Sequence, residues 1–179
     1  MLNKEIVTSS EIIYSGKVLT VRKDSVIACN NKVATRDIVC HNGGVGIVAV
    51  TDDKKVCLVR QYRVAIGDFL TEIPAGKLEA GEEHSEAAVR ELSEETGYTA
   101  DKMTYLGFIY VSPGYCTEKI HIYMASGLKA GECSFDEDED LEVIELDIKD
   151  AVQMVMSGEL TDAKTVYGIL KVNNILEGE

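Results

Sequence analysis

The feature that most constrains this chain is an acidic segment at residues 76–98, GKLEAGEEHSEAAVRELSEETGY. Glu91, Glu94 and Glu95 are spaced by three and four residues, so a helix would place their carboxylates on one face. Gly97 is typical of the residue that ends a helix, which puts two of these carboxylates in the last turn. Negative charge there opposes the helix dipole, and like charges one turn apart repel by roughly 0.2–0.5 kcal/mol per pair.

Two interpretations of this helix are open. A solvated acidic face is the ordinary explanation of a glutamate-rich helix. A divalent cation would instead remove the repulsion, because Mg²⁺ takes oxygen ligands and combines a few carboxylates with substrate phosphates. The first-choice ligands are Glu91 and Glu95, with Glu94 as a second-line ligand or catalytic residue. Arg90, also a catalytic candidate, is expected to orient a glutamate; the alternative is an internal ion pair with Glu82 that shapes the preceding loop.

The composition limits the partners that the chain can bind. Its 179 residues, 45% hydrophobic and 27% charged, suffice for one globular domain with a small extension. A formal net charge of −13 argues against a nucleic-acid surface. The longest uninterrupted apolar run, residues 47–50, is far too short to span a membrane. Five scattered cysteines without a C-x-x-C pair favour reduced thiols in a cytoplasmic protein.

Residue patterns predict an α/β (α+β) fold, in which a mixed β-sheet is sandwiched between helices. Residues 1–40 are expected to form a small antiparallel β extension, and residues 41–179 the main domain. The extension has few large apolar residues, so packing against a second copy of the chain would bury it. The expected strands are 18–22, 26–29, 33–40, 45–50, 56–59, 69–73, 103–111, 120–125 and 141–146. The expected helices are 83–96, 147–157 and 163–176, with a tight turn at 74–76.

The acidic segment also matches a long spaced pattern, G-x5-E-x7-R-E-U-x-E-E-x-G-U, where U is a bulky apolar residue. The matching residues are Gly76, Glu82, Arg90, Glu91, Leu92, Glu94, Glu95, Gly97 and Tyr98. The segment resembles the Nudix hydrolase signature over its full length, with an aromatic residue at the last position where an aliphatic one is more usual. The resemblance implies the Nudix fold and a Mg²⁺ ion, or Mn²⁺, held by Glu91, Glu95 and the Ala75 carbonyl.

Features outside the signature resemble the ADP-ribose pyrophosphatase subfamily. Pro113 lies sixteen residues beyond Gly97, an offset typical of that subfamily, although a turn proline between two strands explains it equally. By the same resemblance Arg36, Arg63 and Glu72 would contact the substrate together with Pro113; surface ion pairs are the alternative for the arginines. Further similar segments are 60–63, 72–76, the acidic loop before 141, and 162–165.

The acidic loop at residues 136–140 carries the candidate catalytic base. Such a charge run would ordinarily be solvated. In the subfamily that the chain resembles, glutamates of this loop close over the substrate and one acts as base. Glu137 and Glu139 are the best positional matches, and Glu137 is preferred. Repulsion within the loop is consistent with a lid that moves until metal and substrate bind.

Taken together, the resemblance implies a cytoplasmic homodimer that uses Mg²⁺ to hydrolyse ADP-ribose, a small-molecule substrate, to AMP and ribose 5-phosphate. The alternatives are the same chemistry on another nucleoside diphosphate sugar or dinucleotide, and a non-catalytic nucleotide-binding module. The clustered glutamates disfavour the module, because a pure binder does not need their charge. His84 is expected to be a solvated residue in the first helical turn, and the tyrosines are too dispersed to identify a partner for adenine.

Overall fold

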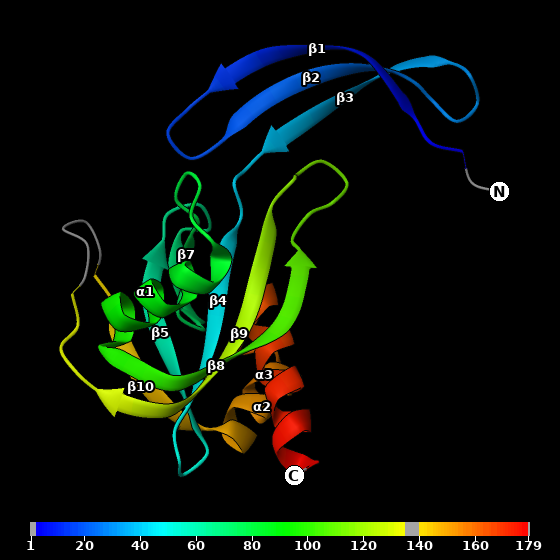
Figure 1. Cartoon of the computed structure of the whole chain (residues 1–179). Helices are drawn as coiled ribbons and strands as arrows, with labels where there is room; N and C mark the ends of the chain where they lie inside the picture. Colours follow the sequence, from blue (N-terminus) through cyan, green and yellow to red (C-terminus); the bar gives the residue numbers. More distant parts are fainter. Residues whose placement is uncertain (1–2, 135–139, 179) are drawn as a thin grey trace. The chain divides into compact units, whose positions relative to one another are not determined.

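The computed structural model describes residues 3–134 and 140–178, and the chain divides into two compact units (Figure 1). The amino-terminal unit consists of Met1–Gly43 and Tyr110–Lys119, and the main unit of Gly44–Ile109 and Ile120–Glu179. Among the described residues, no helix combines the length and the apolar character that crossing a bilayer requires.

The amino-terminal unit is built on a three-stranded antiparallel sheet in the order β1-β2-β3. Its strands are β1 (Ile6–Ser15), β2 (Thr20–Ile27) and β3 (Val33–Cys40). Tyr110–Lys119 joins β3 through a parallel bridge between Val39 and Cys116. Every residue of β1 is exposed, so this sheet buries little of its own apolar surface.

The first strands of this unit differ from the expected ones. β1 is not among the predicted strands, and β2 runs continuously where two separate strands are expected. The register between β1 and β2 shifts between Val7 and Ser9 and again between Ile12 and Tyr14. Each shift reverses the alternation of side chains, so the period-two pattern that identifies a strand is lost.

The main unit contains a seven-stranded sheet in the order β10-β5-β4-β9-β8, with β6 paired to β5 and β7 paired to β4. The strands are β4 (Gly44–Val50), β5 (Lys55–Arg63), β6 (Asp68–Glu72), β7 (Ala75–Lys77), β8 (Tyr98–Tyr110), β9 (Lys119–Ala130) and β10 (Glu142–Asp147). β4 pairs in parallel with β9 and antiparallel with β5 and β7, which makes the sheet mixed. β4 is buried along its whole length, as its continuous run of small and apolar residues indicates for a central strand.

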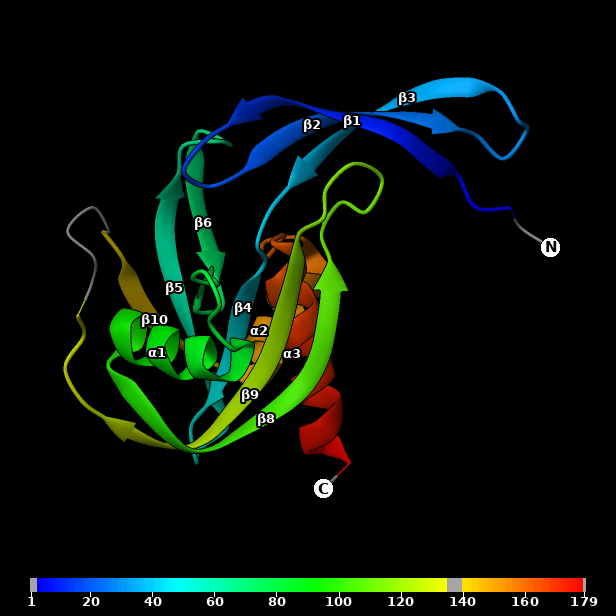
Figure 2. The same ribbon diagram turned by 45° about the horizontal axis from the view of Figure 1, so that its top comes forward.

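Helices cover both faces of the main sheet (Figure 2). They are α1 (His84–Thr96), α2 (Ile148–Ser157) and α3 (Ala163–Glu177). Alternate side chains of β4 point to opposite faces. Val45 and Ile47 share a buried cluster with Leu92 of α1, whereas Val48 shares another with Ile169 of α3. This arrangement confirms the predicted α/β fold with a mixed sheet between helices.

Several strand limits in the main unit differ from the expected ones, among them that of β9, which continues to Ala130. β5 extends to Arg63 because this residue is still paired with Asp68 of β6. β7 is a short strand where a turn is expected, because its backbone pairs with β4. β8 begins at Tyr98, directly after the glycine that ends α1. For β5 and β7, pairing with another strand outweighs a weak local preference.

Tyr98 makes the stability of the main unit depend on pH. Its hydroxyl donates a hydrogen bond of 2.5 Å to Glu145 Oε1 on β10, and this bond, followed by burial, raises the pKa of Tyr98 from 10.0 to about 12. Folding therefore favours the protonated phenol. The contribution of this hydrogen bond to the free energy of unfolding is complete below pH 10.0 and is lost as the pH rises towards about 12. We expect the difference in unfolding free energy between wild type and Tyr98→Phe to shrink over that range in urea titrations; a difference independent of pH would contradict this assignment.

Candidate active site

The helix α1 is delimited by the residues that the sequence indicates. Glu83 is its N-cap, and Gly97 ends it in the left-handed conformation at φ 70°, with its N–H bound to the Ser93 carbonyl. Ala87, Ala88 and Leu92 pack into the buried cluster beneath α1. This packing fixes the rotation of the helix, and with it the direction of the acidic face.

Glu95 and Glu91 both meet the short strand β7. Glu95 is only 2% exposed, and its Oε2 accepts a hydrogen bond of 2.8 Å from the Ala75 N–H. The Glu91 carboxylate lies against the backbone of Gly76, since a Cβ atom on that glycine would come within 1.8 Å of Glu91 Oε1. β7 is held in turn by pairing with Val45 and Gly46 of β4. The structure therefore brings Ala75, Glu91 and Glu95 together.

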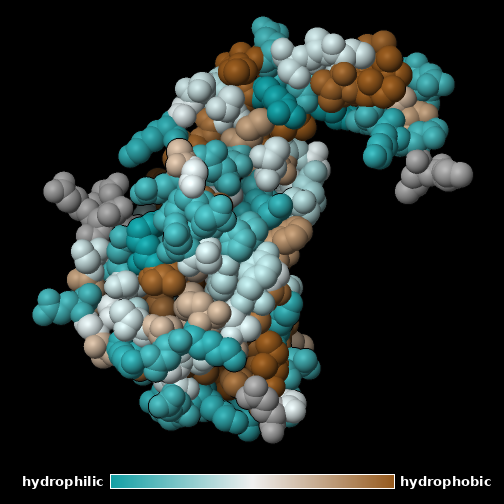
Figure 3. All heavy atoms as spheres, in the orientation of Figure 1, coloured by the Kyte–Doolittle hydropathy of each residue, from teal (hydrophilic) through white to brown (hydrophobic). Residues whose placement is uncertain are grey.

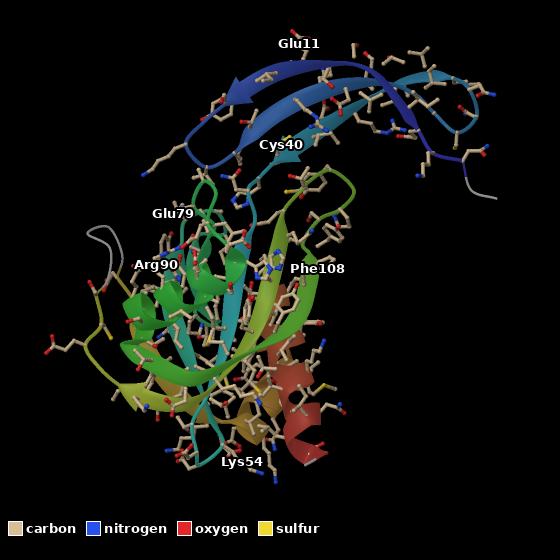
Figure 4. The ribbon with its side chains drawn as sticks, viewed as in Figure 1. Glu11, Cys40, Lys54, Glu79, Arg90 and Phe108 are labelled. Atoms are coloured by element: carbon tan, nitrogen blue, oxygen red, sulfur yellow. The ribbon has the colours of Figure 1, made fainter. Side chains whose placement is uncertain are left out.

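Arg90 lies among the acidic side chains of the segment (Figure 4). Its Nε donates to Glu82 Oε1 at 2.9 Å, while its Nη1 donates to Glu91 Oε1 at 2.8 Å and to Glu94 Oε2 at 2.9 Å. The hydrogen bond with Glu82 and the charges of its neighbours raise the pKa of Arg90, and the same bond lowers the pKa of Glu82. Glu82 also accepts from the Glu79 N–H at 2.9 Å. Arg90 therefore ties the loop before α1 to the acidic face and reduces the repulsion on it.

The donor set at this face fits a hard divalent cation. The Glu95 carboxylate accepts a hydrogen bond from the Ala75 N–H and the Glu91 carboxylate lies against Gly76, so both side chains offer oxygen atoms, as Mg²⁺ prefers. Within residues 3–134 and 140–178, no three His, Cys, Asp or Glu side chains converge closely enough to enclose an ion. A partial set is the usual arrangement for Mg²⁺, which keeps several waters and binds substrate phosphates. Glu94 turns towards Arg90 and is 38% exposed.

A second charged cluster surrounds Glu72 at the end of β6. Glu72 is 2% exposed, and Arg63 of β5 binds it with two hydrogen bonds, Nε to Oε1 at 2.7 Å and Nη2 to Oε2 at 3.1 Å. Lys164 of α3 also donates to Glu72 Oε2, and its Nζ lies 3.1 Å from Asp162 Oδ2. The hydrogen bond to Glu72 raises the pKa of Arg63. Two of the predicted substrate contacts, Arg63 and Glu72, thus form one ion pair, joined by a lysine that the sequence analysis does not single out.

The remaining predicted site residues lie elsewhere. Arg36 is in the amino-terminal unit, where its Nη2 and Nε bind the Glu5 carboxylate at 2.5 and 3.1 Å. Pro113 belongs to the same unit, in an exposed turn whose Ser112 carbonyl accepts from Cys116 N–H at 2.9 Å. Glu137 and Glu139 lie outside the described residues.

A cluster of aromatic and histidine rings at the start of α1 escapes the sequence analysis. The ring of His84 stacks on that of His121 with centroids 3.9 Å apart, and its Nδ1 is 2.5 Å from the Tyr123 hydroxyl. His84 is therefore not the solvated residue that is expected. Tyr105 is 3.0 Å from His121 Nδ1, and Phe108, labelled in Figure 4, also faces this ring. The alternation of His121 and Tyr123 along β9 is the signal that could have placed them on the α1 side.

Comparisons with known proteins match nearly the whole chain. Residues 41–166 match the NUDIX domain family. An ADP-ribose pyrophosphatase of Bacillus subtilis (strain 168) is 45% identical over 93% of this chain and 91% of that protein. A methanol dehydrogenase activator of Bacillus methanolicus is 40% identical over 94% of this chain and 92% of that protein. A crystal structure of an ADP compounds hydrolase has a TM-score of 0.89 at 26% identity, covering 99% of this chain and 97% of that one. These matches confirm the resemblance carried by the acidic segment: the chain belongs to the Nudix family.

Proposed function

We propose that this protein hydrolyses the diphosphate linkage of ADP-ribose to AMP and ribose 5-phosphate in a Mg²⁺-dependent reaction. The observation that carries the proposal is the packing of Glu91 and Glu95 against β7, which gathers oxygen donors on one side of α1. The substrate is the one named for the Bacillus subtilis relative, and the solved relative is a hydrolase of ADP compounds.

The residues around α1 would hold the metal. Glu91, Glu95 and the Ala75 carbonyl are the proposed ligands, with Glu94 as a further ligand when substrate is present. The bound ion would neutralise charge on the phosphoryl oxygens during cleavage. Arg90 acts as the positioning group, because its hydrogen bonds to Glu91 and Glu94 fix the directions of both carboxylates.

Substrate binding and water activation are assigned to other parts of the chain. Arg63, with a side chain 41% exposed, presents its guanidinium to a phosphate, and Glu72 holds it in place. Arg36 and Pro113 are proposed further substrate contacts. Glu137, or else Glu139, takes a proton from the attacking water. The water oxygen then forms the new bond to phosphorus as the bond to the bridging oxygen breaks, which gives the two monophosphates.

We also propose that the protein is a cytoplasmic homodimer joined through the amino-terminal sheet. Ile6, Val7, Ile12 and Tyr14 of β1 are all more than half exposed, and Figure 3 shows hydrophobic residues gathered on this sheet. Exposed apolar patches of this kind are typical of interaction sites. Light scattering of the full chain tests the proposal. A mass near twice 19.6 kDa is expected, and a mass near 19.6 kDa at micromolar concentration would contradict it.

A substrate panel tests the reaction itself. Steady-state rates would be compared for ADP-ribose, other nucleoside diphosphate sugars, dinucleotides and nucleoside triphosphates, with Mg²⁺ and with a chelator. The highest kcat/KM is expected for ADP-ribose, with release of AMP and loss of activity in chelator. A preference for another diphosphate sugar or a dinucleotide would keep the chemistry and change the substrate. A preference for triphosphates would refute the ADP-ribose assignment, and binding without turnover would indicate a non-catalytic module.

A further inference from the structure

Glu72 is a buried carboxylate shared between two cations. Arg63 and Lys164 both hydrogen-bond to it, and Arg63 alone already donates one hydrogen bond to each of its oxygens. The side chain of Lys164 is only 9% exposed, so its burial requires compensation by a specific charge. Glu72 already has a bidentate arginine. The presence of a second cation on it, and a buried one, therefore calls for an explanation.

The surroundings of Lys164 show which charge it compensates. Asp162, its other neighbour, is the N-cap of α3 and accepts hydrogen bonds from the Thr165 N–H at 3.0 Å and from the Thr165 hydroxyl at 2.7 Å. A helix N-terminus carries a partial positive charge of about half a unit, which stabilises a carboxylate placed there. Asp162 is thus balanced in part by α3 itself. Lys164 contacts both carboxylates, and Glu72 is the more deeply buried of the two.

We propose that Lys164 is a positioning residue that neutralises Glu72, so that the positive charge of Arg63 stays available for a phosphate of the substrate. Without the lysine, Arg63 and Glu72 would form an isolated pair with no net charge. With it, the charge of Glu72 is divided between two cations, while Glu72 still orients the partly exposed guanidinium through two hydrogen bonds. Asp162 and Glu95 also act on the charge of Arg63, so the lysine offsets part of the negative charge around it. The inference rests on the proposed function, in which Arg63 binds a substrate phosphate.

The backbone next to Glu72 gives this cluster a fixed place relative to the carboxylates of α1. The Ile73 N–H donates to Thr165 Oγ1 at 2.9 Å, and the Ala75 N–H donates to Glu95 Oε2 at 2.8 Å. One short segment is thereby anchored to both α3 and α1. Arg63 and the proposed metal ligands are consequently held by the same piece of chain.

The test compares Lys164→Met with Lys149→Met, a matched loss of one charge at an exposed position of α2. The readouts are the Kd for ADP-ribose in chelator, where no turnover is expected, and KM and kcat with Mg²⁺. Lys164→Met should raise Kd and KM by roughly tenfold, about 1.4 kcal/mol, because the full charge of Glu72 then acts on Arg63 and competes with the substrate phosphate. The value of kcat should change much less, and Lys149→Met should behave as wild type.

Two double variants separate this role from a merely structural one. Glu72→Gln should restore part of the lost binding in the Lys164→Met protein. Removing the carboxylate charge frees the charge of Arg63, although the amide accepts only one of the two hydrogen bonds that orient the guanidinium. The double variant leaves no unpaired carboxylate buried, so it also serves if Lys164→Met alone does not fold. In an Arg63→Gln background, Lys164→Met should add no further loss. Additive losses, or no rescue by Glu72→Gln, would overturn the proposal. Absence of ADP-ribose binding and turnover in the wild type would instead refute the proposed function.

Discussion

Glu95→Gln is expected to reduce kcat for ADP-ribose by roughly a hundredfold or more without unfolding the protein. The glutamine still offers an oxygen to the Ala75 N–H, so the contact that joins α1 to β7 survives. What is lost is one negative charge on the face proposed to hold Mg²⁺. Steady-state kinetics at increasing Mg²⁺ concentrations measure this loss.

Glu95→Gln should not lower the thermal stability of the metal-free protein, although it lowers kcat. Glu95 is buried in the last turn of α1, beside other carboxylates and at the negative end of the helix dipole. Removing its charge should therefore keep or raise Tm in chelator, while the rise in Tm on adding Mg²⁺ should shrink. Glu86→Gln, the same change at an exposed position of the first turn, is the control. It should leave the kinetics and the rise in Tm on adding Mg²⁺ unchanged, and lower Tm slightly because a carboxylate near a helix N-terminus is favourable. Wild-type kinetics in Glu95→Gln would contradict a metal-binding role for this residue.

Gly76→Ala is expected to lower kcat by about a hundredfold, because a displacement of about 1 Å at a reactive site can have that effect. The added Cβ would lie 1.8 Å from Glu91 Oε1, so the carboxylate must move away from its place beside Gly76. The backbone of Gly76 does not adopt a positive φ, so alanine introduces no conformational strain of its own. The loss should therefore appear in kcat and in the Mg²⁺ requirement, with little change in Tm.

Gly178→Ala is a suitable control for that substitution. A Cβ there would meet its nearest atoms at 3.5 and 3.6 Å, an ordinary van der Waals separation, at the carboxyl end of α3. It should leave both activity and Tm unchanged. If Gly76→Ala had wild-type kcat, the position of Glu91 against β7 would not matter for turnover, and this part of the account would be wrong.

Local signals in the sequence are strong enough to predict α1 and the order of the main elements. Gly97 ends the helix in the left-handed conformation that glycine favours, and the apolar run at Gly44–Val50 forms the buried central strand. The pattern of the acidic segment also identifies Glu91 and Glu95 as neighbours, because helical spacing alone places them on one face.

The contacts between distant segments could not be predicted in this way. Glu72 and Lys164 are 92 residues apart, and nothing in the local pattern of either residue indicates the other. His84 reaches His121 only through the packing of α1 on β9. Neither helical nor strand periodicity contains such information. The contact between Glu91 and Gly76 escapes for a similar reason, since it depends on β7 pairing with β4 rather than forming a turn.

The most direct test of the central claim is the rate of AMP release from ADP-ribose as free Mg²⁺ is raised from zero in chelator. The account predicts no release without the ion and a saturable rise when it is added, with saturation displaced to higher Mg²⁺ in Glu95→Gln. An equal rate in chelator, or no release at any Mg²⁺ concentration, would contradict it.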